Sequence, residues 1–405
     1  MRGKTLAEQV LSAKSGADAY AGSLVLADVD HLMASDTTGP MTIRAFEDMG
    51  GVKPFDSGKI TFVIDHATPC PNQNIANLHA MMRAFARKHR IRLHDAGEGI
   101  CHQLMVEAGF MKPGDLVMGA DSHTCTYGAL GVFSTGVGAT DLAAAMVTGR
   151  SWFKTPETLR IDLDGVPPAT TCGKDIILHV IGSLTADGAT YQSVEFYGPW
   201  LDEAGLANKL TIANMVSEMG AKCCFVCDRH TGIASEPGAV YSRRIRCDLA
   251  AIGPQVACPD AVDNVRPVEA VAGVAIRSAL IGSCTNGRHE DLAIAADIID
   301  GWGIHPDVRL YVNPASRAVL LEAAASGALA RLVRAGAILT TPGCGSCVGT
   351  LGGIPGDNEA VISSTNRNFK GRMGNPNAPV YLASPATVAC SASKGAITDP
   401  RTWRP

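Results

Sequence analysis

One pattern recurs along this chain and limits its fold more than any other feature. A short apolar stretch with strand character ends, and a loop carrying His, Asp, Cys, Asn or Arg follows at once. The pattern occurs at residues 65–66, 94–102, 121–123, 284, 344–347 and 366–372. Helical stretches alternate with these strands, which predicts parallel α/β sheets. Because ligands bind outside the carboxyl ends of parallel strands, we expect these loops to line one cleft between an N-terminal and a C-terminal α/β lobe.

The middle of the chain has a different character. Residues 159–163 alternate apolar and polar side chains, which predicts an exposed antiparallel strand. Residues 254–267 are rich in proline and charge, which predicts a linker. The expected organisation is therefore three α/β domains, at residues 1–155, 156–268 and 269–405.

Composition limits the compartment and the partners. The 405 residues are 46% hydrophobic and 18% charged, as in a soluble and well-buried globular protein. The net charge of −4 gives no reason to expect nucleic acid or an acidic membrane as a partner. The 13 cysteines are an odd number without a disulfide pattern, which favours a reducing compartment. Because neither a signal peptide nor a membrane-length apolar run is present, we predict a cytoplasmic protein.

Two cysteines, Cys344 and Cys347, lie two residues apart in a glycine-rich loop. This spacing alone fits a redox pair, half of a zinc site or part of an iron–sulfur site. A third cysteine, Cys284, follows another predicted strand, whereas no fourth Cys or His has a similar setting, which disfavours structural zinc. Three cysteines favour a cubane cluster with one open iron, which would act as a Lewis acid. The remaining cysteines, including the apolar Cys223–Cys227 stretch, are predicted to be buried core residues.

Three histidines of the strand-end loops have a carboxylate close by in the sequence. The pairs are Asp65 with His66, Asp121 with His123, and Glu98 with His102. A carboxylate fixes the imidazole tautomer and raises its pKa, which suits a general acid. The alternative for each is a histidine that only satisfies a loop hydrogen bond, but three at strand ends favour a site.

Two arginines near the C-terminus, Arg367 and Arg372, accompany Asn366. Guanidinium groups bind carboxylates through two parallel hydrogen bonds, although a solvated loop face is the simpler interpretation. No nucleotide-binding motif is present, since Gly343-x-Gly345 lacks the third glycine and no phosphate-binding lysine loop occurs. Hydride transfer and ATP-driven chemistry therefore have no support.

Taken together, these motifs resemble those of the aconitase superfamily over nearly the whole chain and in the same order. The segments that carry the resemblance are residues 97–103, 121–124, 283–287, 342–347 and 366–372. Within the superfamily, the chain is most similar to the large subunits of 3-isopropylmalate dehydratase and homoaconitase. The resemblance implies three aconitase-type α/β domains around an iron–sulfur cleft, with a [4Fe–4S] cluster held by Cys284, Cys344 and Cys347.

The resemblance also implies roles for individual residues. His66, paired with Asp65, is expected to protonate the departing hydroxyl group. His102 and His123 are expected to be active-site histidines, with Asp121 and Glu195 as their acidic partners. The residues expected to support substrate and cluster are Ser35, Ser122, Asn366, Arg367 and Arg372.

Single-chain aconitases carry a fourth, swivelling domain that provides a serine base, and no such segment follows residue 405. The resemblance therefore implies a small-subunit partner that carries this domain and the substrate-specificity loop. The implied activity is that of a hydro-lyase that isomerises a hydroxy-dicarboxylic acid by loss and re-addition of water. The preferred candidate substrate is 3-isopropylmalate, in leucine biosynthesis, and homocitrate and methylated malates are the alternatives. An iron–sulfur sensor or a zinc-stabilised structural protein remain non-enzymatic alternatives.

Overall fold

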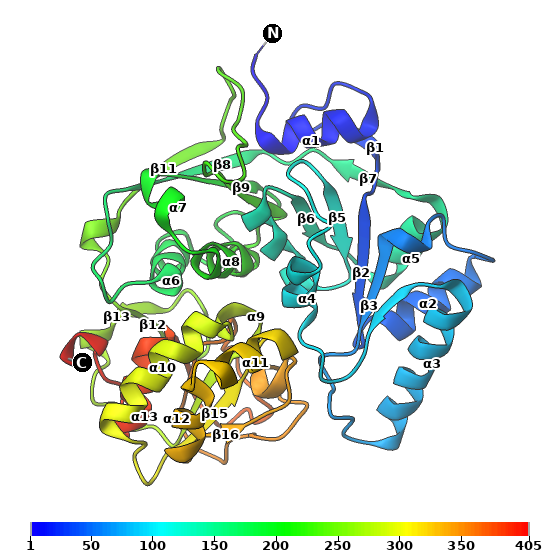
Figure 1. The fold of residues 1–405 in the computed structure, drawn as a ribbon. Helices are drawn as coiled ribbons and strands as arrows, with labels where there is room; N and C mark the ends of the chain where they lie inside the picture. Colours follow the sequence, from blue (N-terminus) through cyan, green and yellow to red (C-terminus); the bar gives the residue numbers. More distant parts are fainter. Residues whose placement is uncertain (1, 404–405) are drawn as a thin grey trace.

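The computed structural model describes residues 2–403, and three parallel or mostly parallel sheets form three lobes around a common centre (Figure 1). The N-terminal lobe is a five-stranded parallel sheet in the order β4-β3-β2-β5-β6. Its strands are β2 (His31–Ser35), β3 (Ile60–Val63), β4 (Arg92–His94), β5 (Leu116–Gly119) and β6 (Phe133–Gly136). Strands β3 and β5 are buried at every residue because helices cover the sheet. These helices are α2 (Gly39–Asp48), α3 (Gln73–His89) and α5 (Ala139–Thr148).

The middle lobe is a four-stranded parallel sheet in the order β10-β9-β8-β11. Its strands are β8 (Thr158–Asp164), β9 (Ser193–Tyr197), β10 (Cys223–Val226) and β11 (Arg243–Asp248). The prediction of an exposed antiparallel strand at 159–163 is wrong, because β8 lies between β9 and β11 and is parallel to both. Strand β10 is fully buried, as predicted for the apolar cysteine stretch. Helices α6 (Gly173–Leu184) and α8 (Leu206–Met215) belong to this lobe.

The C-terminal lobe contains a seven-stranded sheet in the order β13-β12-β18-β17-β14-β15-β16. Its first two strands, β12 (Gln255–Ala257) and β13 (Val265–Pro267), fall inside the segment predicted to be a linker. That prediction is wrong, because β12 pairs with both β13 and β18 (Val380–Ala383). The other strands are β14 (Ser278–Gly282), β15 (Arg309–Asn313), β16 (Ile338–Leu339) and β17 (Val361–Ser363), and the helices are α10 (His289–Trp302), α11 (Arg317–Ala325), α12 (Ala328–Arg334) and α13 (Pro385–Lys394).

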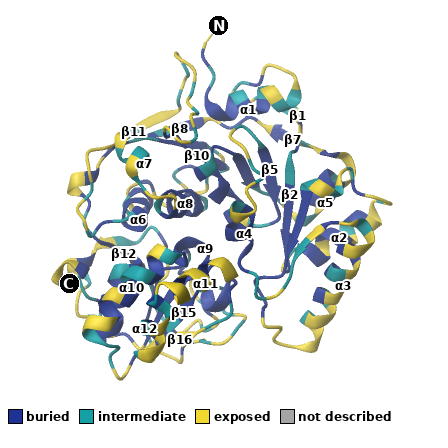
Figure 2. Cartoon of the chain, in the orientation of Figure 1, coloured by how far each residue is buried: buried dark blue, intermediate teal, exposed yellow. Residues whose placement is uncertain are grey.

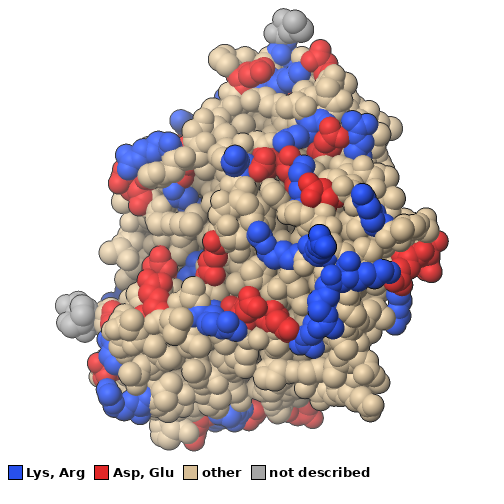
Figure 3. Space-filling model, turned by 45° about the vertical axis from the view of Figure 1, so that its right-hand side comes forward, with Lys and Arg blue, Asp and Glu red and all other residues tan. Residues whose placement is uncertain are grey.

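A smaller unit borders the N-terminal lobe. Helix α1 (Leu6–Ser15) is followed by β1 (Leu24–Asp28), which pairs antiparallel with β7 (Arg150–Lys154). The strands and central helices are buried, whereas the outer face of α3 is exposed (Figure 2). Acidic and basic side chains are intermixed on the face drawn in Figure 3. Among residues 2–403, no helix is both long and apolar enough to cross a bilayer.

Candidate active site

The polar strand-end loops of the N-terminal and C-terminal lobes meet at the centre of the molecule. Asp65 and His66 follow β3, Asp121 follows β5, and Cys284 lies in the short helix α9 (Ser283–Asn286) after β14. The two lobes touch directly, because the backbone N–H of Cys344 donates to the carbonyl oxygen of Asp65 over 2.8 Å. The expected gathering of strand-end loops in one place is thus present.

The three predicted cluster cysteines are all buried in this centre. Cys284, Cys344 and Cys347 belong to one apolar cluster of buried side chains. The side chain of Asn366 bridges two of them, with Nδ2 at 3.5 Å from Cys284 Sγ and Oδ1 at 3.8 Å from Cys347 Sγ. Arg372 Nη2 lies 3.3 Å from Cys347 Sγ. An amide group therefore donates to Cys284 and a guanidinium group donates to Cys347, and donors of this kind favour the thiolate form.

The spacing of the three sulfur atoms bears on which metal group fits them. Around a single tetrahedral zinc ion, with Zn–S bonds of about 2.3 Å, thiolates lie about 3.8 Å apart. Among residues 2–403, no three cysteine sulfur atoms all lie within 4.8 Å of one another. Arg372 Nε is also buried there without a hydrogen-bond partner, so a donor remains free for an acceptor beside Cys347. A polynuclear cluster therefore fits the site better than one ion.

Two glycines let the Cys344–Cys347 loop press against both lobes. At Gly345, where φ is +61°, a Cβ atom would lie 1.9 Å from Asn313 Oδ1. At Gly343, where φ is +155°, it would lie 2.7 Å from the carbonyl oxygen of Asp65. Such φ angles and contacts exclude larger residues, so the glycines are required by the close approach.

The thiols of the trio differ in acidity. Burial raises the pKa of Cys284 to about 11. A hydrogen bond from Cys344 and the nearby Arg372 guanidinium hold the pKa of Cys347 well below its ordinary value. The Arg372 guanidinium thus favours the thiolate form of Cys347, and the thiolate is the form that binds metals.

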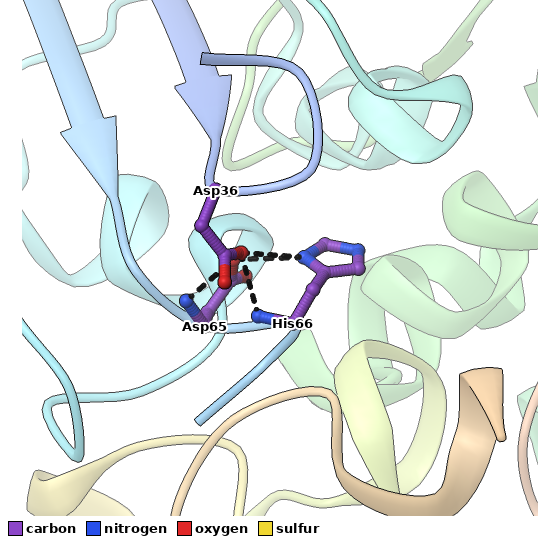
Figure 4. Close-up of side chains that lie close together, drawn as sticks. All are labelled: Asp36, Asp65 and His66. Carbon is purple, nitrogen blue, oxygen red and sulfur yellow. Dashed lines mark hydrogen bonds and ion pairs between the residues drawn. The ribbon is translucent and has the colours of Figure 1, made fainter. Parts of the chain in front are cut away.

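His66 lies among three carboxylates. Its Nδ1 is 2.8 Å from Asp65 Oδ1, and its backbone N–H donates to Asp36 Oδ1 over 2.9 Å (Figure 4). Its Nε2 is 3.4 Å from Asp121 Oδ2. Burial alone would lower the pKa of His66, but Asp65 and Asp121 raise it well above the ordinary value. His66 therefore carries a proton at neutral pH, as a general acid must.

Asp36 was not singled out by the sequence, although it lies beside Ser35. One oxygen accepts from the backbone of His66, and the other accepts from the backbone of Ala67 over 2.9 Å and from His79 Nε2 over 3.0 Å. Asp36, Asp65 and His66 are close enough to hold a metal ion. Because both Asp36 oxygens already accept hydrogen bonds, we interpret Asp36 as the support that fixes the His66 loop.

Asp121 connects the three histidines. Its Oδ1 is 2.8 Å from His102 Nε2 and accepts the backbone N–H of His123 over 2.9 Å, while Oδ2 faces His66. Burial opposes its charge, but these three contacts hold the pKa of Asp121 well below its ordinary value. The other ring nitrogen of His102 lies 3.2 Å from the Tyr127 hydroxyl. The structure thus places Asp121 as the acidic partner of His102.

The predicted role of Glu195 as an acidic partner of these histidines is wrong. Its Oε1 accepts the backbone N–H of Leu6 over 2.8 Å, and its Oε2 accepts from Ser235 Oγ over 2.7 Å and from Tyr197 over 2.9 Å. Glu195 therefore anchors the start of α1. Glu98 is likewise not a partner of His102, because it pairs with His94 over 2.8 Å.

The carboxylate that sequence reasoning missed is Glu218. Its Oε1 lies 2.8 Å from His123 Nε2 and 2.8 Å from Arg367 Nε. Burial opposes its charge, but His123 and Arg367 lower the pKa of Glu218 from 4.5 to about 2. Its one signal in the sequence is an acidic residue inside an otherwise apolar helical stretch of the middle domain.

An open pocket of about 650 Å³ reaches this centre. Its lining residues include Asp121, Ser122 and Arg367, together with Thr37 and Thr38. Ser35 is not a lining residue: it is fully buried, and its hydroxyl lies 2.8 Å from that of Thr37. Ser35 therefore does not face this pocket, whereas the two threonines do.

Comparisons with known proteins agree on one family. The profile of the Aconitase family (aconitate hydratase) matches residues 7–232 and 269–395. The 3-isopropylmalate dehydratase large subunit 1 of Methanopyrus kandleri is 44% identical, over 99% of this chain and 100% of its own length. The 3-isopropylmalate dehydratase large subunit 1 of Thermotoga maritima is 46% identical, over 98% and 99%. The probable methanogen homoaconitase large subunit of Methanothermobacter thermautotrophicus is 43% identical, over 98% and 97%.

The fold is also found among solved structures. The holo-form of aconitase X from Thermococcus kodakaraensis matches with a TM-score of 0.54 at 15% identity, covering 89% of this chain and 88% of that one. At this identity the likeness supports the aconitase-type α/β fold alone.

Proposed function

The chain belongs to the aconitase family, and we propose that it is the large, cluster-bearing subunit of a two-chain hydro-lyase that isomerises a hydroxy-dicarboxylic acid. One observation carries the proposal: a histidine in contact with three carboxylates lies in the same buried centre as a trio of cysteine thiols. An iron–sulfur sensor requires the thiols, but its function does not require histidines paired with carboxylates. A [4Fe–4S] cluster held by Cys284, Cys344 and Cys347 would supply Lewis acidity toward a substrate oxygen.

His66 is the proposed general acid. Its Nδ1 is held by Asp65 at 2.8 Å, whereas its Nε2 has only the longer 3.4 Å contact with Asp121. Nε2 is therefore the atom that delivers a proton to the departing hydroxyl group. Asp121 keeps His66 and His102 in fixed orientations during this step.

Arg367 is the proposed anchor for a substrate carboxylate. Its Nε is engaged by both oxygens of Glu218, at 2.8 and 3.0 Å, and its side chain lines the pocket. The terminal nitrogens of its guanidinium group are thus oriented for a carboxylate. Ser122 lines the same pocket. Arg372 and Asn366, which contact the thiols, support the cluster side of the site.

The base that removes the proton from carbon is proposed to come from a small subunit. Relatives named as large subunits imply such a partner. Its swivelling domain would cover the open pocket with a serine base and a specificity loop. We propose 3-isopropylmalate as the substrate, in cytoplasmic leucine biosynthesis, with homocitrate or a methylated malate as the alternative. Relatives of both names match at 43 to 46% identity, so identity does not separate these substrates.

Anaerobic reconstitution tests the proposal. The chain is loaded with iron and sulfide, analysed for both, combined with a small subunit of the same family and assayed on a panel of malate-type acids. We expect a cluster in the large subunit and turnover of 3-isopropylmalate only with both chains present. Zinc without labile sulfide would contradict the cluster, and a cluster without turnover of any acid would favour a sensor.

A further inference from the structure

Lys174 is a buried cation that the chemistry above does not use. It lies in α6 of the middle lobe and is fully buried. Its Nζ donates to two backbone carbonyl oxygens, of Ser364 over 2.9 Å and of Thr365. Within the described part of the chain, no ion pair joins this ammonium group to a carboxylate. Burying a charge without a counter-charge costs stability, so we expect Lys174 to have a specific role at this position.

The neighbouring carboxylate of Asp175 makes no direct hydrogen bond or ion pair with Lys174. Its two oxygens accept the backbone N–H groups of Cys172, over 3.0 Å, and of Gln255, over 2.9 Å. Burial also raises the pKa of Asp175 to about 6. Asp175 therefore holds the start of α6 and the start of β12, and the hydrogen bonds of Lys174 go to the carbonyl groups.

These carbonyl groups belong to the turn that joins two cysteine loops. Ser364 Oγ accepts the backbone N–H of Gly282, which starts the Cys284 loop, over 3.1 Å. Asn366, two residues after Ser364, contacts Cys284 Sγ over 3.5 Å. Lys174 thus holds, from another lobe, the point at which the Cys284 loop meets the Asn366 turn.

The ammonium group is linked to the thiols through the backbone, because Thr365, whose carbonyl accepts from Nζ, directly precedes Asn366, which contacts Cys284 Sγ over 3.5 Å. Burial lowers the pKa of Lys174 to about 8, while Cys172, Asp175 and Cys347 favour its charged form. The ammonium group therefore remains mostly protonated at neutral pH. Cysteine ligands bind a metal as thiolates, which carry negative charge. Lys174 has no ion-pair partner of its own among residues 2–403, so its positive charge can offset part of that negative charge.

We propose that Lys174 is a positioning residue for the iron–sulfur cluster: its ammonium group holds the turn at residues 364–366 against the Cys284 loop and brings a positive charge to that turn. The inference rests on the proposed function, because it requires a cluster on these thiols. It assigns to the middle lobe a direct part in cluster retention.

The test compares variants in their retention of the cluster. Lys174→Met removes the charge and the donors, whereas Lys174→Gln removes the charge and keeps a donor. Lys209→Met is the matched control, because Lys209 is also a buried lysine of this lobe but pairs with Asp228. Each chain is reconstituted, and iron content, labile sulfide and the rate of loss of the cluster absorbance in air are measured. We expect both Lys174 variants to lose the cluster roughly 10- to 100-fold faster, and the control to lose thermal stability but not cluster lifetime.

A second measurement, of the reduction potential, separates the effect of the lost positive charge from an effect on protein folding. Loss of a nearby positive charge makes a cluster harder to reduce, so we expect a more negative reduction potential in Lys174→Gln and an unchanged one in Lys209→Met. A Lys174→Gln chain with the wild-type cluster lifetime and potential would overturn the proposal, even if Lys174→Met fails to fold. If the wild-type chain binds no iron and sulfide, the proposed function fails instead, so the two failures are distinguishable.

Discussion

Replacing Glu218 by Gln tests the carboxylate that the sequence did not reveal. The substitution keeps the shape of the side chain and removes the charge that faces His123 and Arg367. The lowering of the Glu218 pKa from 4.5 to about 2 corresponds to about 3 kcal/mol of favourable interaction with the charged form. We therefore expect a loss of about 3 kcal/mol in the free energy of unfolding at pH 7, and a decrease in kcat/KM on the order of a hundredfold, because His123 and Arg367 lose their common support.

The stability contribution of Glu218 should depend on pH in a defined direction. Because the pKa of Glu218 is lowered in the folded state, its contribution is complete above about pH 4.5 and disappears as the pH falls toward 2. The stability deficit of Glu218→Gln, measured by denaturant unfolding, should therefore shrink over that range. Glu195→Gln is the control, since Glu195 anchors α1 and should leave kcat/KM of the assembled enzyme unchanged. A deficit that is constant with pH, or equal kinetic effects of both variants, would refute the reasoning.

Three further variants test the rest of the site. Cys347→Ser should abolish the cluster absorbance and turnover, whereas Cys227→Ser should preserve both; equal effects would mean that the wrong thiols were chosen. Gly345→Ala should prevent cluster assembly because its Cβ has no room, whereas Gly205→Ala meets nothing within 4 Å and should retain iron and sulfide. His66→Asn should lower kcat roughly 10²- to 10⁴-fold and leave the cluster spectrum intact; near-normal turnover would remove His66 as the general acid.

Local sequence patterns predicted the parts of the site that lie at strand ends. Cys284 and His66 come within a few residues of the ends of the buried strands β14 and β3, and the topology of a parallel sheet brings such positions together. Glu218 and Lys174 could not be found in this way. Each is a single polar residue on a helix or a 3₁₀ turn of the middle lobe, and only tertiary packing brings it to the site.

The two errors in the fold have similar physical causes. Strand β8 alternates because its polar residues Arg160 and Asp162 form an ion pair, with 2.7 Å between Nη2 and Oδ1, and Arg160 also lies over the Tyr197 ring. This covered polar face resembles a solvated one in the sequence, although the strand is parallel on both sides. Strand β12 joins the C-terminal sheet through Val256, which pairs with Ala383 far along the chain. No local pattern records such a long-range partner.

The middle lobe therefore acts on the site through individual side chains rather than through loops of its own. Asn214 donates to Cys284 Sγ over 3.3 Å, Lys174 holds the turn before Asn366, and Glu218 orients both His123 and Arg367. A small shift of this lobe would alter the acidic network and the surroundings of the thiols at the same time. The loss of cluster retention in Lys174 variants and the loss of kcat/KM in Glu218→Gln thus have one structural cause. In both, the middle lobe fixes how the N-terminal and C-terminal lobes meet.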